Sequence, residues 1–267
     1  MLRWFEHRQV YVPSSVFSGN PNDLGRPFED VYFSSLDGVR LNGWYFPAEP
    51  SSPRSHLVLL LLHGNGGNIC HRLDFFEVWL RLGVNLFVFD YRGYGRSEGR
   101  PSEEGTYLDA QAAHKWVREK GFSPANIVAL GKSLGGGVAS ELALRETIGS
   151  LILQSTFNNI PSVGAELFPW LPVKRFHTIK YDTLSRLPRI RVPVLVMHSR
   201  ADQVIGYHHA ERNFAAANDP KMFCEIFGHH TGALDFGARQ YAEGLERFFR
   251  QYVDTAPTLS VPQQTLA

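Results

Sequence analysis

This sequence is poor in cysteine, nearly balanced in charge and free of long hydrophobic runs. Its two cysteines, Cys70 and Cys224, lie far apart in apolar surroundings, so we expect two buried, reduced thiols rather than a disulfide. A net charge of +1 lacks the strongly basic character that nucleic-acid binding requires, and we expect no nucleic-acid partner. The apolar run at residues 57–62 is long enough for a strand but much too short for a membrane span.

Other absences narrow the function further. Residues 1–8 lack the apolar core of a signal peptide, so we expect a cytoplasmic protein. The histidines, cysteines and aspartates show no spacing typical of a metal site, and we expect no metal. The glycine-rich loop at residues 62–68 has neither the Gly-x-Gly-x-x-Gly spacing of a dinucleotide site nor the lysine of a phosphate-binding loop. We therefore expect no cofactor.

The order of the apolar segments predicts an α/β fold. Residues 1–29 are rich in proline, glycine, asparagine and serine and indicate an irregular arm. Two β-rich segments around an Asp37-Gly38 turn predict a hairpin. From residue 56 onward strand and helix patterns alternate, which predicts a mostly parallel, eight-stranded sheet with helices on both faces. The expected strands are residues 29–34, 39–46, 56–62, 84–89, 127–130, 150–153, 194–197 and 222–227, and the expected helices are residues 72–82, 103–120, 133–145, 206–217 and 234–253.

The length of the chain bounds the number of domains. With 267 residues and 43% hydrophobic content, the chain can bury one large core but not two α/β domains of usual size. We assign residues 1–253 to a single domain. Residues 254–267 are polar and contain proline and glutamine, and we expect them to form a disordered tail.

Residues 157–190, hereafter the cap insert, interrupt the alternation of strands and helices. The cap insert carries four prolines with aromatic residues and leucines between them. Inserts of this length are either functional lids or disordered loops, and the aromatic content argues against disorder. We expect a small cap over the site, with a short helix near residues 163–168. Phe168 and Trp170 are too apolar to face water without reason, and we expect them to bind substrate.

The segment Val128-Ala-Leu-Gly131-Lys-Ser133-Leu-Gly135 joins an expected strand to an expected helix. Gly-x-Ser-x-Gly in this setting is typical of a nucleophile elbow, a tight turn that holds the serine oxygen above the sheet. Glycine flanks the serine because a Cβ at either position would collide with the turn or with a crossing strand. The helix N-terminus would also favour developing negative charge at Ser133. We assign Ser133 as the nucleophile.

The loop His63-Gly64-Asn65-Gly66-Gly67 follows the first buried strand. An oxyanion hole needs backbone N–H groups, unblocked by side chains, that point at the space above the nucleophile. We assign one N–H to Asn65 and the other to Leu134, the residue after the nucleophile. An ordinary turn between strand and helix is the alternative for this loop. We expect His63 to hold the loop through a hydrogen bond rather than to act in catalysis.

Two later loops supply a candidate acid and a candidate base. Asp202 follows a buried strand beyond the nucleophile strand, from where it can reach a histidine in the next loop; capping of the following helix is its alternative role. Asp90 also ends a strand, but the glycines after it predict a turn in which Asp90 accepts backbone N–H groups. Two adjacent histidines follow the last strand. We prefer His230 to His229 as the base because His230 leads the segment that opens the last helix.

The order Ser133, Asp202, His230 is that of the α/β hydrolases, and the sequence resembles this superfamily from about residue 30 to residue 253. It is similar to a compact group that carries His-Gly-Asn, Asp-Tyr-Arg-Gly-Tyr-Gly and Gly-Lys-Ser-Leu-Gly-Gly, here at residues 63–65, 90–95 and 131–136. That group includes protein depalmitoylases, and its core is similar to the catalytic domain of prolyl-oligopeptidase-type peptidases.

The resemblance implies an α/β-hydrolase fold and a serine hydrolase that cleaves acyl esters of small molecules. Thioesterase or peptidase activity, or a catalytically silent binding protein, are the alternatives. Two features depart from the group. The cysteine-rich segment with which depalmitoylases attach to membranes is not present, and the usual Gly-His-Asn-Asp near the base is replaced by Gly-His229-His230-Thr.

Overall fold

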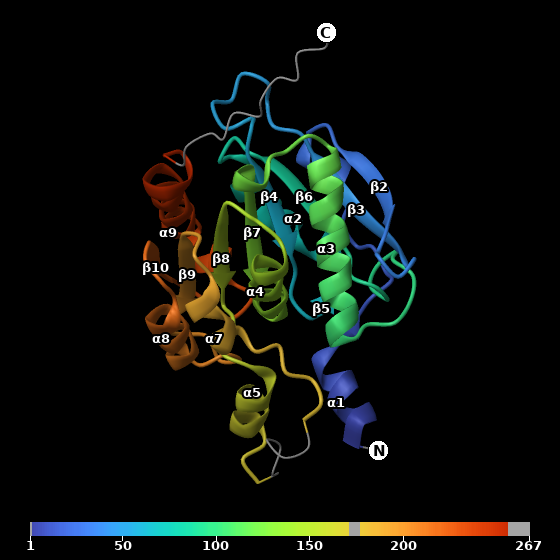
Figure 1. The fold of residues 1–267 in the computed structure, drawn as a ribbon, viewed down its shortest axis with the longest axis vertical. Coiled ribbons are helices and arrows are strands. Elements are labelled where there is room, and N and C mark those ends of the chain that lie inside the picture. Colours follow the sequence, from blue (N-terminus) through green and yellow to red (C-terminus); the bar gives the residue numbers. More distant parts are fainter. Residues whose placement is uncertain (1, 171–176, 256–267) are drawn as a thin grey trace.

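The computed structural model describes residues 2–170 and 177–255 (Figure 1). Within them eight strands form one sheet, in the order β10-β9-β8-β7-β4-β6-β3-β2. Only β3 runs against the others, because it pairs antiparallel with both β2 and β6. The mostly parallel sheet is confirmed, and the hairpin at its edge contributes a single reversed strand. The strands span β2 Glu29–Ser34, β3 Arg40–Phe46, β4 Val58–Leu62, β6 Asn85–Phe89, β7 Ile127–Lys132, β8 Ser150–Gln154, β9 Val194–Ser199 and β10 Lys221–Ile226.

Helices cover both faces of the sheet, as expected. Successive side chains of a strand point to opposite faces, so neighbouring leucines of β4 enter different cores. Leu60 belongs to one core with residues of α3, α4 and α8, whereas Leu59 belongs to a second core with residues of α2 and α9. The helices span α2 Leu73–Leu80, α3 Glu103–Glu119, α4 Leu134–Arg145, α8 Tyr207–Ala216 and α9 Ala233–Phe248, which a last turn at Phe249–Val253 extends.

The N-terminal segment corrects the expectation of an irregular arm over residues 1–29. Helix α1 spans Leu2–Val10, and strand β1, Val12–Pro13, follows it. Every proline and glycine of the segment lies beyond α1, at residues 13–27, so composition averaged over the whole segment concealed the helix. Strand β1 pairs in parallel with β5, Gly66–Gly67, which belongs to the predicted oxyanion loop.

The cap insert places helix α5, Ile160–Leu167, at the same end of the molecule as α1 (Figure 1). The helix begins earlier than expected because Asn159 caps it. The Asn159 side chain accepts the N–H of Ser162 at 2.8 Å, and the intervening Pro161 suits the first turn of a helix.

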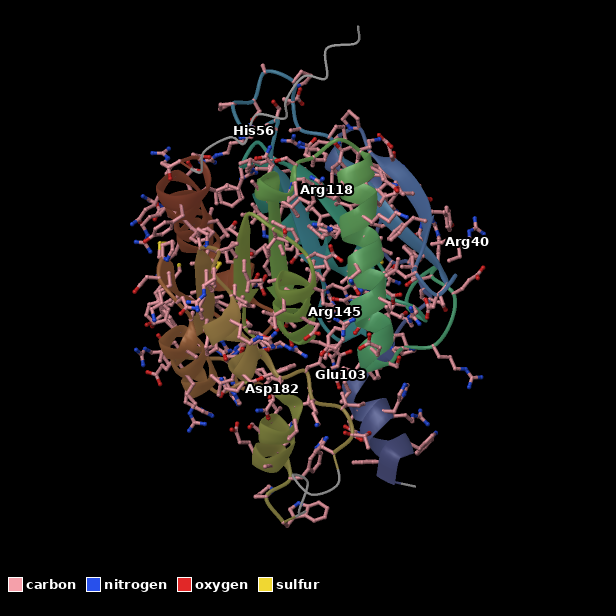
Figure 2. All side chains as sticks on the ribbon, in the orientation of Figure 1. Arg40, His56, Glu103, Arg118, Arg145 and Asp182 are labelled. Carbon is pink, nitrogen blue, oxygen red and sulfur yellow. The ribbon has the colours of Figure 1, made fainter. Side chains whose placement is uncertain are left out.

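The chain that returns from the cap insert is anchored to α3. The carboxylate of Glu103 accepts the N–H groups of Lys180 and Tyr181, each at 2.7 Å. Figure 2 shows Glu103 near Asp182, whose side chain caps α7, Thr183–Arg186. The return of the cap insert is therefore held on the same end of the core from which α5 departs.

Two expectations fall partly outside the described residues, namely residues 171–176 of the cap insert and residues 256–267 of the expected tail. No helix in the described ranges combines the length and the apolar character that a membrane crossing requires.

Cys70 and Cys224 are both buried and free, which confirms the expectation of two thiols.

Candidate active site

Ser133 lies in the turn between β7 and α4 with an unusual backbone conformation. Its φ of 54° and ψ of −117° lie outside the regions that residues other than glycine favour. Two hydrogen bonds hold the turn in place. The N–H of Ser133 donates to the carbonyl of Gln154 at 2.9 Å, and the Thr156 hydroxyl donates to the carbonyl of Ser133 at 2.6 Å. Residues at the end of β8 therefore stabilise the strained residue.

Close packing requires glycine on either side of Ser133. A Cβ on Gly131 would lie 2.4 Å from the carbonyl oxygen of Gly135. A Cβ on Gly135 would lie 1.8 Å from the carbonyl oxygen of Leu62, at the end of β4. Helix α4 thus starts in direct contact with the neighbouring strand, and only glycine permits this approach.

His230 connects the hydroxyl of Ser133 to the carboxylate of Asp202. Nε2 of His230 lies 3.0 Å from Oγ of Ser133, and Nδ1 lies 2.7 Å from Oδ2 of Asp202. Because a carboxylate only accepts, Nδ1 carries the proton and Nε2 can accept the serine proton. The three residues follow β7, β9 and β10, whose carboxyl ends meet at one edge of the sheet. The predicted nucleophile, acid and base are therefore brought together.

The environment of Asp202 keeps its carboxylate charged. Burial alone would raise the pKa of Asp202, but hydrogen bonds from His230 and from the N–H groups of Ile205 and Val204 hold this pKa below its ordinary value. Both N–H groups lie 2.9 Å from Oδ1, which leaves Oδ2 for His230. Asp202 does not cap α8, because that helix begins later, after Gly206.

The alternative base and the alternative acid lie elsewhere. The ring of His229 packs against Phe236 with centroids 5.8 Å apart. Asp90 is fully buried behind the oxyanion loop, where its Oδ1 accepts the N–H of Ile69 at 2.9 Å. In the described part of the chain, neither His229 nor Asp90 forms a hydrogen bond with Ser133. The backbone contact of Asp90 is the one expected of a turn residue.

Asn65 and Leu134, the predicted oxyanion donors, line the same cavity as Ser133. Leu134 is the first residue of α4, so its N–H has no acceptor within the helix. The carbonyl of Asn65 accepts the N–H of Val12 at 3.1 Å and the hydroxyl of Tyr94 at 2.9 Å. The N-terminal strand, which sequence analysis missed, thus orients the peptide groups of the oxyanion loop.

Behind this loop lies a buried pair, His63 and Asp90. Nδ1–H of His63 donates to the carbonyl of Gly64 at 2.7 Å, which is the loop-holding bond expected for this residue. Burial lowers the pKa of His63 to about 3 and raises the pKa of Asp90 to about 8. Although Nε2 of His63 lies 3.5 Å from Oδ1 of Asp90, both groups are therefore mainly uncharged at neutral pH.

A cavity of about 400 Å³ lies beside Ser133 and His230. Phe168 lines this cavity, but Trp170 does not. The Trp170 side chain is 77% exposed and meets Phe168 edge-on, with ring centroids 6.3 Å apart. The chain has left the cavity wall two residues after Phe168, so of the two predicted substrate-binding residues only Phe168 is in position. The other apolar lining residues are Phe5, Val10, Phe157, Ile160, Val163, Leu167, Val204 and Ile205.

Part of the cavity wall comes from α1, which sequence analysis missed. Phe5, Glu6, Gln9 and Val10 all line the cavity. Their spacing of i, i+1, i+4 and i+5 places them on one face of a helix, but two are apolar and two are polar, so no hydrophobic periodicity marks this face in the sequence. The rings of Phe5 and Phe168 lie 6.3 Å apart, which joins α1 directly to the cap insert.

One group of metal-ligating side chains comes together in the described ranges, namely Glu166, His208 and His209. Sequence spacing did not reveal it, because Glu166 lies on α5 and both histidines lie on α8. Nδ1 of the buried His209 accepts the N–H of Asn158 at 3.1 Å, so its Nε2 carries the proton and donates to Glu166 at 3.2 Å. A protonated Nε2 cannot bind a metal, and this cluster instead attaches α5 to α8.

Comparisons with known proteins agree with this architecture. Residues 58–176 match the family model described as alpha/beta hydrolase fold. An uncharacterized protein of Mycobacterium tuberculosis is 34% identical, with 94% of this chain and 90% of that protein covered. The alpha/beta hydrolase domain-containing protein WAV2 of Arabidopsis thaliana is 30% identical, with the same two shares covered, 94% and 90%. An esterase of Pyrococcus furiosus has a similar fold, with a TM-score of 0.75, 20% identity, and 91% of this chain and 98% of the esterase covered.

Proposed function

We propose that this chain, which belongs to the α/β hydrolase family, is a serine hydrolase that cleaves acyl esters of small molecules. The observation that carries the proposal is the hydrogen-bonded series from Ser133 through His230 to Asp202, with distances of 3.0 and 2.7 Å. A serine hydroxyl becomes a nucleophile when a neighbouring base can take its proton. The adjoining apolar cavity, about 400 Å³ in volume, supports a small-molecule acyl substrate.

In the proposed reaction, Oγ of Ser133 attacks the ester carbonyl while Nε2 of His230 takes the hydroxyl proton. The N–H groups of Asn65 and Leu134 stabilise the negative charge that develops on the carbonyl oxygen. His230 then gives its proton to the departing alkoxide, which leaves the acyl group on Ser133. A water molecule, deprotonated by His230, attacks this acyl-enzyme, and His230 returns that proton to Oγ of Ser133 as the acid is released. Asp202 holds the imidazole and stabilises its charged form in both halves of the reaction.

Covalent labelling tests the nucleophile directly. A fluorophosphonate probe should label the wild-type protein, and peptide mapping should place the label on Ser133. Ser133→Ala should abolish labelling, whereas Ser185→Ala should not, because Ser185 is an exposed serine of α7. A wild-type protein that stays unlabelled would favour a silent binding protein on a hydrolase fold.

A substrate panel tests the ester assignment. The wild type and Ser133→Ala are compared on matched acyl esters, acyl thioesters and aminoacyl amides, with kcat/KM as the readout. We expect the highest kcat/KM on esters and no turnover above background in the variant. A clear preference for thioesters or amides would replace the ester assignment with thioesterase or peptidase activity.

A further inference from the structure

The cavity beside Ser133 has two unlike walls. The wall from α5 and the residue that follows it is apolar, and it contains Ile160, Val163, Leu167 and Phe168. The wall from α1 and the returning chain is mixed, because it carries the polar residues Glu6, Gln9 and His177 beside the apolar Phe5 and Val10. Both walls lie at the end of the molecule where α1 and α5 project from the core (Figure 1). An apolar cavity with polar groups on one wall is suited to a substrate that is itself polar at one place.

Glu6 and His177 form a buried pair on this mixed wall. Nδ1–H of His177 donates to Oε1 of Glu6 at 2.5 Å. The side chain of Glu6 is 8% exposed and that of His177 is 11% exposed. The N–H groups of Thr178 and Ile179 and the hydroxyl of Thr178 also donate to Glu6, at 2.9, 3.0 and 2.7 Å. These donors occupy the acceptor positions of the carboxylate. Glu6 therefore orients His177 rather than binding a ligand itself.

Among the residues that the structure describes, the second nitrogen of His177 has no such partner. Its Nε2 is buried and forms no hydrogen bond with any of the described residues. Because Nδ1 carries the proton, Nε2 of the neutral ring is an acceptor. Buried polar atoms without a partner are rare in folded proteins, because each one costs free energy. Because His177 lines the substrate cavity, a small rotation of its ring would bring this atom to the cavity surface, where a substrate group can become its partner.

We propose that His177, with Gln9 on the same wall, recognises a hydroxyl group of the substrate. The preferred ester would then carry one apolar chain, which lies along α5, and one hydroxyl-bearing group. This inference rests on the proposed ester hydrolysis. A hydroxyl suits the site because it can donate to Nε2, whereas an anionic group would be repelled by the carboxylate of Glu6, 2.5 Å from the same ring. The hydroxyl belongs either to the alcohol part of the ester or to its acyl part.

Pairs of esters that differ in one group distinguish these sources. The hydroxypropyl ester of octanoic acid is compared with the butyl ester, and methyl ω-hydroxyoctanoate is compared with methyl nonanoate. We expect the wild type to favour the hydroxylated member of one pair by about tenfold in kcat/KM, the effect of one good hydrogen bond. A ratio near one in both pairs would overturn the proposal. So would a preference for monomethyl octanedioate, which presents an anion instead of a hydroxyl.

His177→Asn is the sharpest variant, because asparagine retains a donor for Glu6 near the position of Nδ1 but has no atom near Nε2. The hydroxyl preference should fall from about tenfold to about one, since the acceptor is lost. His56→Asn is the matched control; His56 is exposed at the opposite end of the molecule from the cap insert (Figure 2), and this variant should keep the wild-type ratio. An unchanged ratio in His177→Asn would refute the assignment. If His177→Asn fails to fold, Gln9→Leu tests the same wall: it should lower the hydroxyl preference, and an unchanged ratio would refute the assignment.

Binding measurements separate this inference from the proposed reaction. Calorimetry with Ser133→Ala protein compares the Kd values of the two members of each ester pair, which requires no turnover. If the wild type neither hydrolyses esters nor reacts with the fluorophosphonate, the proposed reaction fails. A tenfold difference in Kd that disappears in the Ser133→Ala/His177→Asn double variant would still support hydroxyl recognition. Equal Kd values within both pairs would refute it.

Discussion

The floor and the roof of the cavity are held in different ways. The floor consists of Ser133, Asp202 and His230, which extend from the ends of strands in one continuous sheet. The roof consists of α1 and the cap insert, which a few side chains attach to the core and to each other, such as Glu6 with His177. Groups that carry out chemistry need fixed positions, whereas groups that select a substrate can lie on separate segments. We therefore expect substitutions in the floor to affect turnover and those in the roof to affect selectivity.

The largest expected effect is in the floor, at the candidate base. His230→Ala should lower turnover of an activated ester by roughly 10⁴–10⁶, and adding it to Ser133→Ala should cost nothing further, because residues that act as one unit are not additive. His229→Ala should lose at most roughly tenfold, as a neighbour outside the hydrogen-bonded series. Steady-state kinetics of the variants on one ester decide between the two histidines. A severe loss in His229→Ala alone would identify His229 as the base.

A somewhat smaller effect is expected at the candidate acid. Asp202→Asn should lower kcat by about 10⁴, because an amide favours the wrong tautomer of the histidine. Asp90→Asn should lose far less, because Asp90 contacts the backbone behind the loop and not the base. Both variants are measured on the same ester, with melting temperature as the control for folding. The reverse ranking would mean that Asp90, not Asp202, supports the base.

The sequence allowed the floor to be predicted because its signals are local. Gly131 and Gly135 mark the turn around Ser133, and parallel strands must bring their carboxyl ends to one edge of the sheet. The preference for His230 over His229 rested on a weaker local signal, its place before the segment that opens the last helix. A shift of one residue in a loop points the side chain in another direction, and the structure places the ring of His230 beside Ser133.

The roof could not be predicted in the same way, because its contacts join residues far apart in the sequence. The hydrogen bond between Glu6 and His177 spans 171 residues. His209 gives a second example. His209 lies on α8 but is fully buried, because Asn158 and Glu166 of the cap insert bind its two nitrogens.

A third prediction concerns the pH dependence of the stability contributed by Asp90, which is buried behind the oxyanion loop. Burial raises the pKa of Asp90 to about 8 from 3.8, so its contribution to stability is complete below the unfolded pKa and is lost as pH rises toward 8. Asp90→Asn removes this loss. The unfolding free energy of the variant minus that of the wild type should therefore be about 1–3 kcal/mol more favourable to the variant at pH 8 than at pH 5. Urea denaturation at the two pH values measures the difference.

Asp37→Asn is the matched control for this pH dependence. A hydrogen bond from Arg92 lowers the pKa of Asp37, so its contribution to stability is present above the unfolded pKa and is lost only as pH falls through the folded value. Because Arg92 stays charged at every pH measured, Asp37→Asn should change stability equally at pH 5 and pH 8. An Asp90→Asn variant that behaves in the same way would mean that Asp90 is ionised at neutral pH.

The smallest expected effect is in the roof. Phe168→Ala should lower the ratio of kcat/KM on octanoyl over acetyl esters by about three- to tenfold, because a long chain loses an apolar contact that a short chain never makes. Trp170→Ala should change this ratio less than about twofold, because its side chain is 77% exposed and lies outside the cavity. Both variants remove an aromatic side chain from the same stretch of the cap insert, so a general disturbance would affect them alike. A larger change in Trp170→Ala than in Phe168→Ala would place Trp170 against the acyl chain of the substrate. Equal losses on short and long esters in Phe168→Ala would show that the roof supports the floor rather than selecting the substrate.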